Sequence, residues 1–340
     1  MMTGMKKQPE VAVIILNWNG EKLLDEFLPS VIANTNPEIG KVIVVDNGST
    51  DGSLALLENK FGGVEVLRFE ENHGYAGGYN LAIEHYAHKY PYVVLLNSDV
   101  AVDDDWLSPL YSFMDEHKDV AACQPKILSY RNRAQFEYAG ACGGFIDRNG
   151  YPYCRGRVFA TLEDDCAQYD DVMPIFWATG AALMIRSELY LKVGGLDVDF
   201  FAHMEEIDLC WRVHLSGGKI YVVPQSHVFH LGGGSLDASN PRKTYLNFRN
   251  NLLMLHKNLP KTVGKRTLLW RRLLDAIAWF RFVVSFDLKN AKAVLKAHRD
   301  FRKMRKKYVE FPMVDLLHTK PARPNILIDY FLLNRKRWRR

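Results

Sequence analysis

The stretch "YVVLLNSDVAVDDDW" (92–106) joins an apolar run to a concentration of carboxylates. Its first five residues are apolar or aromatic and predict a fully buried strand that leads directly into Asn97 and Asp99. Three consecutive acids follow at 103–105. Carboxylates at the exposed tip of a core strand commonly hold a divalent metal, and they also commonly cap the next helix. The stretch therefore predicts a buried strand with a polar tip and leaves the role of its acids open.

The same succession of buried strand and helix recurs along the first hundred residues. Strands rich in Val, Ile and Leu are predicted at 11–19, 41–46, 64–72 and 92–99, with amphipathic helices between them. This alternation indicates an α/β fold with a parallel sheet that is covered on both faces. In such sheets ligands bind beyond the carboxyl ends of the strands. The predicted strands all end in polar residues: Asn17 and Asn19, Asp46 and Asn47, Asn72, and Asn97 and Asp99.

Composition indicates a globular protein with an uneven distribution of charge. The chain has 340 residues and is 48% hydrophobic, enough for one large domain or two ordinary ones. Residues 241–340 contain 26 Lys and Arg against 6 Asp and Glu, a net charge of +20, and residues 1–240 contain 18 against 33, or −15. A basic tail suits an anionic phospholipid or nucleic acid surface, or it forms a solvated helical appendage. We favour phospholipid among these.

The sequence indicates neither a targeting segment nor a cysteine framework. The opening "MMTGMKKQPE" lacks the apolar segment of a secretory signal, so we expect a cytoplasmic location, with peripheral contact to the inner face of the membrane through the basic tail. The cysteines never form a Cys-x-x-Cys pair, and we expect reduced structural thiols. They are Cys123, Cys142, Cys154, Cys166 and Cys210.

Two later regions depart from the alternating pattern. Residues 130–175 are rich in Gly, Tyr and Asp with weak periodicity, which predicts a long excursion or small hairpins. Residues 268–288 are very apolar, but charged residues interrupt them too often for a membrane span. We interpret this segment as an interfacial amphipathic helix, and a helix packed on the rest of the protein is the alternative. Its apolar face would contain Leu269, Leu273, Ile277, Phe280 and Val284.

Polar segments at neighbouring strand ends suit a nucleoside and its phosphates. "ILNWNG" (15–20) and "VVDNGSTDGS" (44–53) together predict a polar pocket at two adjacent strand tips. "ENHGYAGGYN" (71–80) adds glycines that permit close approach of the backbone, and Asn80 is predicted at the start of a helix whose amides favour phosphate. The segment is neither a Walker loop nor a Gly-x-Gly-x-x-Gly fingerprint, so it identifies no nucleotide-binding class by itself.

Seven motifs follow one another between residues 10 and 256: "VAVIILNWNG", "VVDNGSTDGS", "ENHGYAGGYN", "LLNSDV", "ATGAALMIR", "GGLDVDFFAHMEEIDLCWR" and "VFHLGGGS". In this order they resemble the family 2 glycosyltransferases, particularly the bacterial rhamnosyltransferase-like members. The resemblance implies a GT-A fold with a mixed, mostly parallel sheet and helices on both faces. It also implies a nucleotide-diphosphate sugar donor, a divalent cation and inversion at the anomeric carbon. We assign the nucleotide-sugar-binding and catalytic domain to 1–256, and a basic, amphipathic helical region to 257–340.

The resemblance also implies a metal site. In the family, the fourth strand ends in an Asp-x-Asp motif, and here Asn97 replaces the first acid and leaves Asp99 as the metal-competent carboxylate. Hard oxygen ligands together with diphosphate oxygens suit Mg or Mn. His230 matches the family histidine that precedes a Gly-rich turn and sometimes ligates the metal, with His227 as a weaker candidate. Ser235 in that turn would cap phosphate. The acids at 103–105 precede the helical pattern "WLSPLYSFM", and we interpret them as a helix cap.

A second acidic cluster lies in "FFAHMEEIDLCWR" (200–212). In a helix that begins near Glu205, the side chains of Glu205, Asp208 and Arg212 share one face and can pair. Glu206 points about 100° away, which leaves its carboxylate free to take a proton from an acceptor hydroxyl. This agrees with the family pattern, in which the second acid of the pair is the general base. A solvated acidic helix start is the alternative, above all for Asp208.

These observations predict a complete set of site residues. We expect catalytic roles for Glu206, Glu205 and Asp208, and metal ligation by Asp99 and His230. We expect donor binding by Asn17, Trp18, Asp46, Asn47, Gly77, Asn80, Asn97 and Ser98. Lys243, Arg249 and Asn250 lie on a predicted helix and either contact the diphosphate or acceptor or are surface cations and their neighbours.

The predicted reaction is inverting transfer of a sugar from dTDP-rhamnose or a UDP or GDP sugar to a hydroxyl of a glycan or lipid-linked glycan, in the synthesis of cell-surface polysaccharide. A sugar-phosphate nucleotidyltransferase is one alternative, but it usually needs a cation-bearing Gly-rich loop near the N-terminus, and "ILNWNG" has no cation. A non-enzymatic binding protein that uses the basic tail on nucleic acid is the other, and it would leave the acidic clusters without a role.

Overall fold

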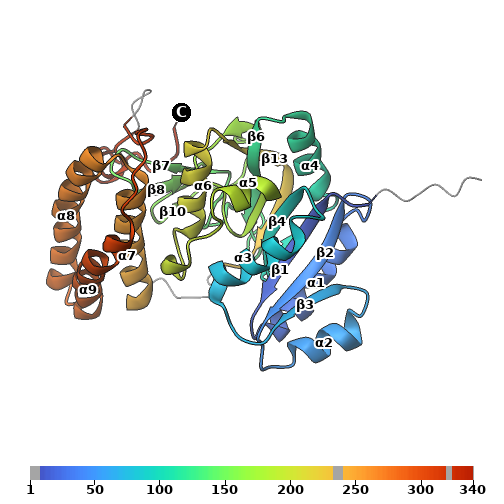
Figure 1. Ribbon diagram of the computed structural model, residues 1–340. Coiled ribbons are helices and arrows are strands. Elements are labelled where there is room, and N and C mark those ends of the chain that lie inside the picture. The colour runs from blue at the N-terminus through green and yellow to red at the C-terminus, as the bar shows by residue number, and fades with distance from the viewer. Residues whose placement is uncertain (1–7, 233–239, 319–323, 340) are drawn as a thin grey trace, which may run out of the picture.

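A single mixed sheet forms the centre of the protein (Figure 1). The computed structural model describes residues 8–232, 240–318 and 324–339. The strands of the sheet are β1 (Val11–Asn17), β2 (Gly40–Asn47), β3 (Glu65–Phe69), β4 (Tyr92–Asn97), β5 (Val100–Val102), β6 (Val120–Ser129), β11 (Met173–Pro174), β12 (Ala182–Arg186) and β13 (Lys219–His230). They are ordered β11-β13-β6-β12-β4-β1-β2-β3, and β5 pairs with β13. The pairs among β1 to β4 are parallel, and β12 runs antiparallel between β4 and β6.

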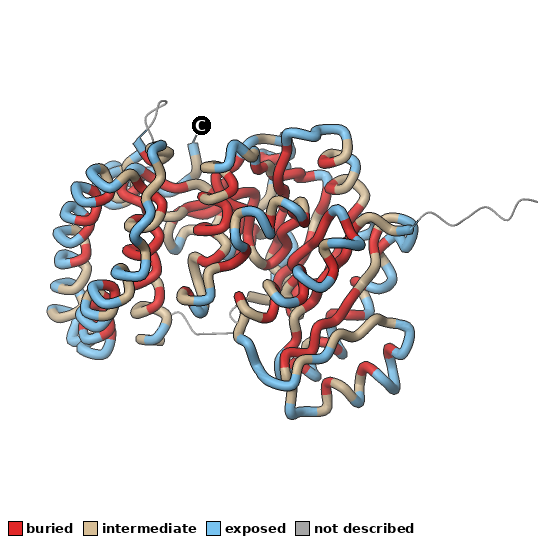
Figure 2. The backbone as a smooth tube through the Cα atoms, viewed as in Figure 1, coloured by how far each residue is buried: buried red, intermediate tan, exposed pale blue. Residues whose placement is uncertain are grey.

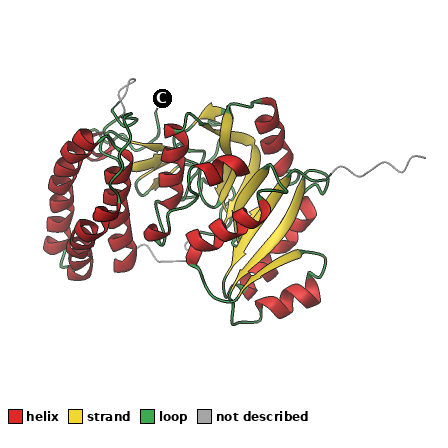
Figure 3. Ribbon diagram, viewed as in Figure 1, coloured by secondary structure: helices red, strands yellow, loops and turns green. Residues whose placement is uncertain are grey.

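Helices cover both faces of this sheet, as predicted (Figure 3). They are α1 (Glu21–Asn34), α2 (Ser53–Lys60), α3 (Gly74–Tyr86), α4 (Leu107–Glu116), α5 (Ser187–Lys192) and α6 (Glu205–Leu215). Successive residues of β1 alternate between two hydrophobic cores, with Ile14 packed among residues of α3 and α6 and Val13 among residues of α1, α2 and α4. Because both faces are buried, the strands are continuously apolar instead of alternating in polarity.

The excursion between β6 and β12 contains a second, smaller sheet. Its strands are β7 (Gly144–Ile146), β8 (Pro152–Cys154), β9 (Arg157–Val158) and β10 (Thr161–Leu162), all paired in antiparallel order. The prediction of small hairpins within 130–175 is therefore confirmed. Of the five cysteines, all are free thiols, and all except Cys166 are buried.

Three helices pack against one another beside the sheet, namely α7 (Pro241–Asn258), α8 (Lys261–Val284) and α9 (Leu288–Met304) (Figure 1). After α9 the described chain contains only a 3₁₀ turn, η2 (Arg305–Lys307), and one π-helical turn, η3 (Ile328–Leu332). The helical prediction for 257–340 thus holds for its first half only. The predicted division at 256/257 falls in the last turn of α7 and stays a prediction. Among the described helices, none has the length and apolar character needed to cross a bilayer.

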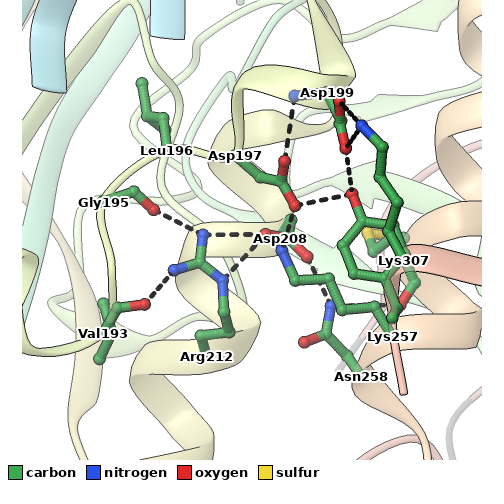
Figure 4. Close-up of polar contacts among 12 residues, drawn as sticks. Val193, Gly195, Leu196, Asp197, Asp199, Asp208, Arg212, Lys257, Asn258 and Lys307 are labelled. Carbon is green, nitrogen blue, oxygen red and sulfur yellow. Dashed lines mark hydrogen bonds and ion pairs between the residues drawn. The ribbon is translucent and has the colours of Figure 1, made fainter. Parts of the chain in front are cut away.

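A buried ionic network joins these helices to α6 (Figure 4). Asp208 of α6 is 0% exposed, and its carboxylate accepts hydrogen bonds from Arg212 Nε at 2.9 Å, Lys257 Nζ at 2.9 Å and Asn258 Nδ2 at 2.7 Å. Lys257 also donates to Asp197 at 2.6 Å. Burial acts to raise the pKa of Asp208, but Arg212 and Lys257 hold it below its ordinary value. The network therefore fixes the end of α7 against α6 through charges that are largely shielded from water.

We expect Asp208→Asn to lower the free energy of unfolding by about 3 kcal/mol, because the substitution leaves Arg212 and Lys257 without their shared buried anion. Chemical denaturation at neutral pH measures this loss. Asp199→Asn is the matched control, since Asp199 pairs with Lys307, whose side chain is 62% exposed, and such a pair contributes at most about 1 kcal/mol. Equal losses in the two variants would contradict the structural role assigned to Asp208.

Candidate active site

The tips of β1 and β2 bring two buried polar side chains together. The parallel register pairs Asn17 with Asp46, and both residues are at most 1% exposed. Asn17 Nδ2 donates to Asp46 Oδ1 at 3.3 Å, and the amide of Ser49 donates to Asp46 Oδ2 at 3.1 Å. Asn17 Oδ1 has no hydrogen-bond partner in the described part of the chain. Trp18 stands beside this pair with 56% of its surface exposed. A buried acceptor without a partner is rare in native proteins and indicates a place for a ligand or a water molecule.

Asn47, which was predicted to bind the donor, lies at the end of β2 and contacts the turn between β3 and α3. Its Nδ2 donates to Asn72 Oδ1 at 3.0 Å and to the Gly74 carbonyl at 3.1 Å, and its Oδ1 accepts from the amide of His73 at 3.0 Å. The side chain of Asn47 therefore holds the turn before α3 in place. Gly77, also predicted at this site, is partly buried in the first turn of α3.

The predicted position of Asn80 at a helix start is wrong. Helix α3 begins at Gly74, so Asn80 lies in its second turn. Its Nδ2 donates to the Leu196 carbonyl at 2.8 Å, and its Oδ1 accepts from the Leu196 amide at 2.9 Å and from Tyr190 Oη at 2.7 Å. These contacts engage both the oxygen and the nitrogen of the amide group, so Asn80 supports the segment that leads to α6.

The tip of β4 carries the predicted metal ligand. Asp99 follows the partly buried residues Asn97 and Ser98 and is itself 8% exposed. The pairing of β5 with β13 brings His230 beside it, with 3.1 Å between His230 Nε2 and Asp99 Oδ1. The two residues named from the sequence as metal ligands are therefore neighbours in space.

Glu137, which the sequence did not identify, lies on the other side of the same imidazole. His230 Nδ1 is 3.3 Å from Glu137 Oε2, and the side chains of both residues are less than 10% exposed. Burial acts to lower the pKa of His230, but the contacts with Asp99 and Glu137 raise it to about 10. A carboxylate behind a histidine is the usual outer-shell arrangement that orients a metal-binding imidazole. Glu137 stands in the irregular excursion, where no periodicity marks it.

The Asp99 and His230 pair fits a divalent cation. Two donor atoms bound to one ion at about 2.1 Å and at right angles lie about 3 Å apart. The 3.1 Å between Asp99 Oδ1 and His230 Nε2 is that of a hydrogen bond, so a cation would take the place of the proton between the two atoms. In the three described ranges, no group of three or more His, Cys, Asp or Glu side chains is arranged to hold a metal ion. The protein would thus supply two ligands at this position, and oxygen atoms of a bound diphosphate or of water would supply the others.

The second acidic cluster begins helix α6 after a constrained turn. Phe201, His203 and Met204 have φ values of 67°, 67° and 74°, which non-glycine residues rarely adopt. Asn250 of α7 stabilises this turn, because its Nδ2 donates to the carbonyls of Phe200, Ala202 and His203 at 2.8 to 2.9 Å. The neighbouring Arg249 guanidinium also donates to the Phe200 carbonyl, at 2.7 Å.

The structure gives Arg249 and Asn250 of α7 a different role from the two predicted ones, which were contact with the diphosphate or acceptor and a position on the surface. Arg249 is 8% exposed and Asn250 is 0% exposed, so neither is a surface group, and both bind backbone carbonyls of the turn before α6. Lys243, in the first turn of α7, is partly buried, and its Nζ lies 5.7 Å from the ring centre of Tyr138. Together α7 and the turn position the start of α6 and its two glutamates.

Glu205 and Glu206 are desolvated carboxyl groups, each with one oxygen that has no hydrogen-bond partner among the described residues. The Oε2 atom of each is buried and accepts no hydrogen bond from the described residues. Burial raises the pKa of Glu206 to about 7. Burial and the charge of Glu206 raise the pKa of Glu205 well above its ordinary value. A carboxylate with a pKa near neutrality is suited to general base catalysis, and of the two this describes Glu206.

Asp208 and Arg212 do not form the predicted triad with Glu205. Arg212 pairs with Asp208, and its Nη2 also donates to the Gly195 carbonyl at 2.6 Å. The structure does not support the catalytic role predicted for Asp208, because its carboxylate is fully buried and engaged by the ionic network described above. The helical start at Glu205 is confirmed.

Tyr75 connects the tip of β4 with α6 and is the second residue that the sequence did not identify. Its Oη donates to Asn97 Oδ1 at 3.3 Å and to the Gly180 carbonyl at 3.0 Å. A Cβ atom added at Gly180 would lie 2.7 Å from Tyr75 Oη and 3.8 Å from Glu206 Cβ. The segment of Asn97 and the segment of Glu206 therefore meet around Tyr75 at one edge of the sheet.

The remaining candidates lie away from this edge or outside the described residues. The acids at 103–105 are exposed, no side chain forms a cap hydrogen bond to α4, and Asp105 contacts the hydroxyl of Ser108 instead. The prediction that these acids cap α4 is thus wrong, because none of them forms a cap hydrogen bond, although they do precede the helix. His227 Nδ1 lies 3.6 Å from Asp103 Oδ2. Ser235 falls in the segment 233–239, outside the described residues.

Known proteins resemble this chain in both sequence and fold. Residues 12–142 match the sequence model of glycosyl transferase family 2. A hexosyltransferase of low-salt glycan biosynthesis, Agl10 of Haloferax volcanii, is 22% identical over 75% of this chain and 78% of its own length. The N-acetylglucosaminyl-diphospho-decaprenol L-rhamnosyltransferase of Mycobacterium tuberculosis is 25% identical over 64% of this chain and 75% of its own length.

The fold resembles that of a mannosyltransferase, PcManGT of Pyrobaculum calidifontis, solved with GDP-Man and Mn²⁺. The two structures align with a TM-score of 0.53 and 15% identity, over 88% of this chain and 84% of the other. This likeness shows the fold alone. The family match over residues 12–142 includes Asn17, Asp46 and Asp99. In sequence and in fold this chain is therefore similar to the family 2 glycosyltransferases, which include rhamnosyltransferases, and its fold is of the GT-A type.

Proposed function

We propose that this glycosyltransferase inverts the anomeric configuration as it moves a sugar from a nucleotide-diphosphate donor to a hydroxyl group of a glycan or lipid-linked glycan. The observation that carries the proposal is the position of Tyr75, whose hydroxyl contacts Asn97, two residues before Asp99, and the carbonyl of Gly180, which lies beside Glu206. Asp99 lies beside His230 at 3.1 Å, and Glu206 is a desolvated carboxyl group. Names of relatives support the acceptor class, because the mycobacterial relative is an N-acetylglucosaminyl-diphospho-decaprenol L-rhamnosyltransferase.

The donor is proposed to lie across the strand tips. Its nucleoside would contact the buried Asn17 and Asp46 pair and the exposed ring of Trp18, which can stack on a base. The unpartnered Asn17 Oδ1 can accept a hydrogen bond from the nucleoside. The proposed donor is dTDP-rhamnose or a UDP or GDP sugar.

Glu206 is proposed to remove the proton of the acceptor hydroxyl. The deprotonated oxygen then attacks the anomeric carbon from the face opposite the nucleotide, the bond to the diphosphate oxygen breaks, and the configuration inverts. The absence of a protein partner on Glu206 Oε2 leaves that atom able to accept the proton. Glu205, whose pKa is raised well above its ordinary value by burial and by the charge of Glu206, would stay protonated and neutral beside it.

Asp99 and His230 would hold a divalent cation, Mg or Mn, that offsets the charge of the diphosphate leaving group when it is bound. Glu137 would keep the imidazole of His230 oriented toward that position. Because His230 carries a proton below pH of about 10 in the absence of metal, occupation of the site must release that proton, and metal affinity should increase with pH.

A thermal-shift screen tests the donor proposal. UDP, dTDP and GDP sugars are added with and without Mn²⁺, and a nucleotide sugar that binds the folded state raises the melting temperature by mass action. We expect at least one donor to raise it by more in the presence of Mn²⁺ than in its absence, and the same donor to support transfer to a glycan acceptor. If no nucleotide sugar shifts the melting temperature under either condition, the proposal is wrong.

Two observations count against the alternative functions. No cation-bearing Gly-rich loop of a nucleotidyltransferase occurs near the N-terminus of the sequence. The family match and the desolvated acids favour an enzyme over a binding protein without catalysis. The cytoplasmic location, with contact to the inner face of a membrane, stays a proposal.

A further inference from the structure

Helix α8 has its polar and apolar faces reversed relative to an ordinary surface helix. Toward the rest of the protein it presents Arg271 and Asp275, which are 2% and 1% exposed. Their side chains pair at 3.2 Å, Arg271 donates to the Asn149 carbonyl at 3.2 Å, and Asp275 lies 3.1 Å from His298 of α9. Ionic contacts thus join α8 to its neighbours beside the buried Leu268, and most of its other large apolar side chains lie elsewhere on the helix.

The opposite face of α8 carries those apolar side chains into solvent. The exposed fractions are 62% for Leu269, 55% for Leu273, 67% for Ile277, 60% for Phe280 and 54% for Val284. At about 100° per residue these five positions fall within an arc of about 80°, centred opposite the buried Arg271 and Asp275. Figure 2 shows this side of α8 facing away from the sheet. The stripe continues past the helix end with Phe286, which is 88% exposed.

Cations surround this apolar stripe, and no exposed acid does. Between residues 261 and 299 the only acids are Asp275 and Asp287, and neither is exposed. The exposed cations along α8 and the start of α9 are Lys261, Lys265, Arg266, Arg272, Arg281, Lys289 and Lys292. A helix with Leu, Trp and Phe on one side and Lys and Arg at the margins is typical of segments that lie in the headgroup region of an anionic bilayer.

A cavity of about 490 Å³ opens at the N-terminal end of the same helix. It is lined by Arg148, Arg266 and Trp270, among others. Trp270 is 51% exposed and follows Leu269 of the apolar stripe. Its rim also includes Asp315 and His318, which pair at 3.0 Å. The exposed Arg266 guanidinium beside an apolar surface suits the phosphate of a lipid headgroup, because a guanidinium binds phosphate oxygens in a bidentate manner.

We propose that the exposed face of α8, defined by Leu269, Leu273, Ile277, Phe280 and Val284, docks the protein on the surface of an anionic phospholipid bilayer. The charge decides between this occupant and a second copy of the chain, because residues 241–340 carry a net charge of +20 and two such regions would repel each other. The proposal goes beyond the sugar transfer and does not depend on it. Vesicle binding can therefore succeed or fail whatever the donor and acceptor are.

Co-sedimentation of the full chain with vesicles tests the docking face. We expect binding to vesicles made of equal parts phosphatidylcholine and phosphatidylglycerol, weaker binding as salt is raised, and little binding to phosphatidylcholine alone. The triple substitution Leu273→Ser, Ile277→Ser and Phe280→Ser should lower the partition coefficient at least about tenfold. Because these side chains are exposed, the melting temperature should stay close to that of the wild type.

A matched control removes exposed apolar side chains elsewhere. Ile32→Ser and Leu191→Ser alter residues that are 39% and 44% exposed on α1 and α5, and this double variant should bind vesicles like the wild type. Arg272→Glu with Arg281→Glu should abolish the preference for anionic vesicles. The proposal is overturned if the wild type ignores anionic vesicles or if the triple variant binds them equally well. It is also overturned if light scattering shows a wild-type dimer that the triple variant loses while neither protein binds vesicles, since a second copy would then occupy the face.

Discussion

Glu206→Gln is expected to lower the turnover number by about 100-fold to 10,000-fold, because the amide cannot accept the proton of the attacking hydroxyl. The affinity for the donor should change little, since Glu206 contacts neither the predicted nucleoside site at Asn17 and Asp46 nor the Asp99 and His230 pair. Steady-state kinetics with the donor found in the thermal-shift screen measures the turnover, and calorimetry with the same donor measures the affinity. Unchanged turnover would reject Glu206 as the base.

The pH dependence separates the catalytic role of Glu206 from a structural one. With a pKa of about 7, the carboxylate form increases through neutrality, so kcat/KM of the wild type should rise as pH increases from about 6 to 8. Stability should change in the opposite direction. The folded pKa lies above the ordinary 4.5, so the folded protein retains a proton that the unfolded chain has lost, and stability falls as pH rises from about 4.5 to 7.

Glu206→Gln removes this penalty together with the charge. At pH 8 the variant should therefore be more stable than the wild type, by an amount on the order of 2 kcal/mol after allowance for the partial exposure of the side chain. The difference should disappear below pH of about 4.5, where both folded and unfolded wild type are protonated. An inactive variant with lower stability at pH 8 would indicate that Glu206 supports the fold instead of the reaction.

Asp99→Ala is expected to lower kcat/KM by at least about 100-fold, because loss of the proposed carboxylate ligand would remove a divalent cation that would contribute several kcal/mol to the stabilisation of the leaving group. Titration of Mn²⁺ in the presence of the nucleotide diphosphate should show a parallel loss of metal affinity. Binding of the nucleotide without metal should change little, since Asn17 and Asp46 remain. Full activity of the variant, or activity that is independent of Mn²⁺ in the wild type, would rule out the proposed metal site.

Glu137→Gln provides a graded comparison in the same titration. Glu137 lies 3.3 Å from His230 Nδ1 and does not contact the proposed cation position. A substitution behind a metal-binding histidine typically weakens the metal about 10-fold to 100-fold, so Glu137→Gln should fall between the wild type and Asp99→Ala. A variant that is destabilised but binds Mn²⁺ normally would make Glu137 a purely structural residue.

Local patterns in the sequence were sufficient to predict the sheet and one edge of the site. Continuous runs of Val, Ile and Leu marked β1, β2 and β4, and the polar residues after them had to lie together because parallel strands in register end at one edge. The start of α6 at Glu205 and the free carboxylate of Glu206 followed from helical spacing. The neighbourhood of Asp99 and His230, 131 residues apart in the chain, came from resemblance to a family and not from any periodicity.

The tertiary structure decided what each polar side chain contacts, because partners far apart in the chain leave no local pattern. Asp208 has a helical spacing that suits a site, but Lys257 and Asn258 arrive from α7 and bury it in a structural network. Asn250 looked like a surface residue and instead holds the turn before α6.

Glu137 and Tyr75 became visible only through their contacts with His230 and Asn97. The exposure of the apolar face of α8 was likewise decided by the tertiary structure. Helical spacing predicts which residues share a face, but only the packing of α7 and α9 decides which face is buried. The sequence by itself thus determined the elements and their order. The tertiary structure decided the desolvation that sets the pKa of Glu206. It also decided which face of α8 is exposed and can contact a membrane.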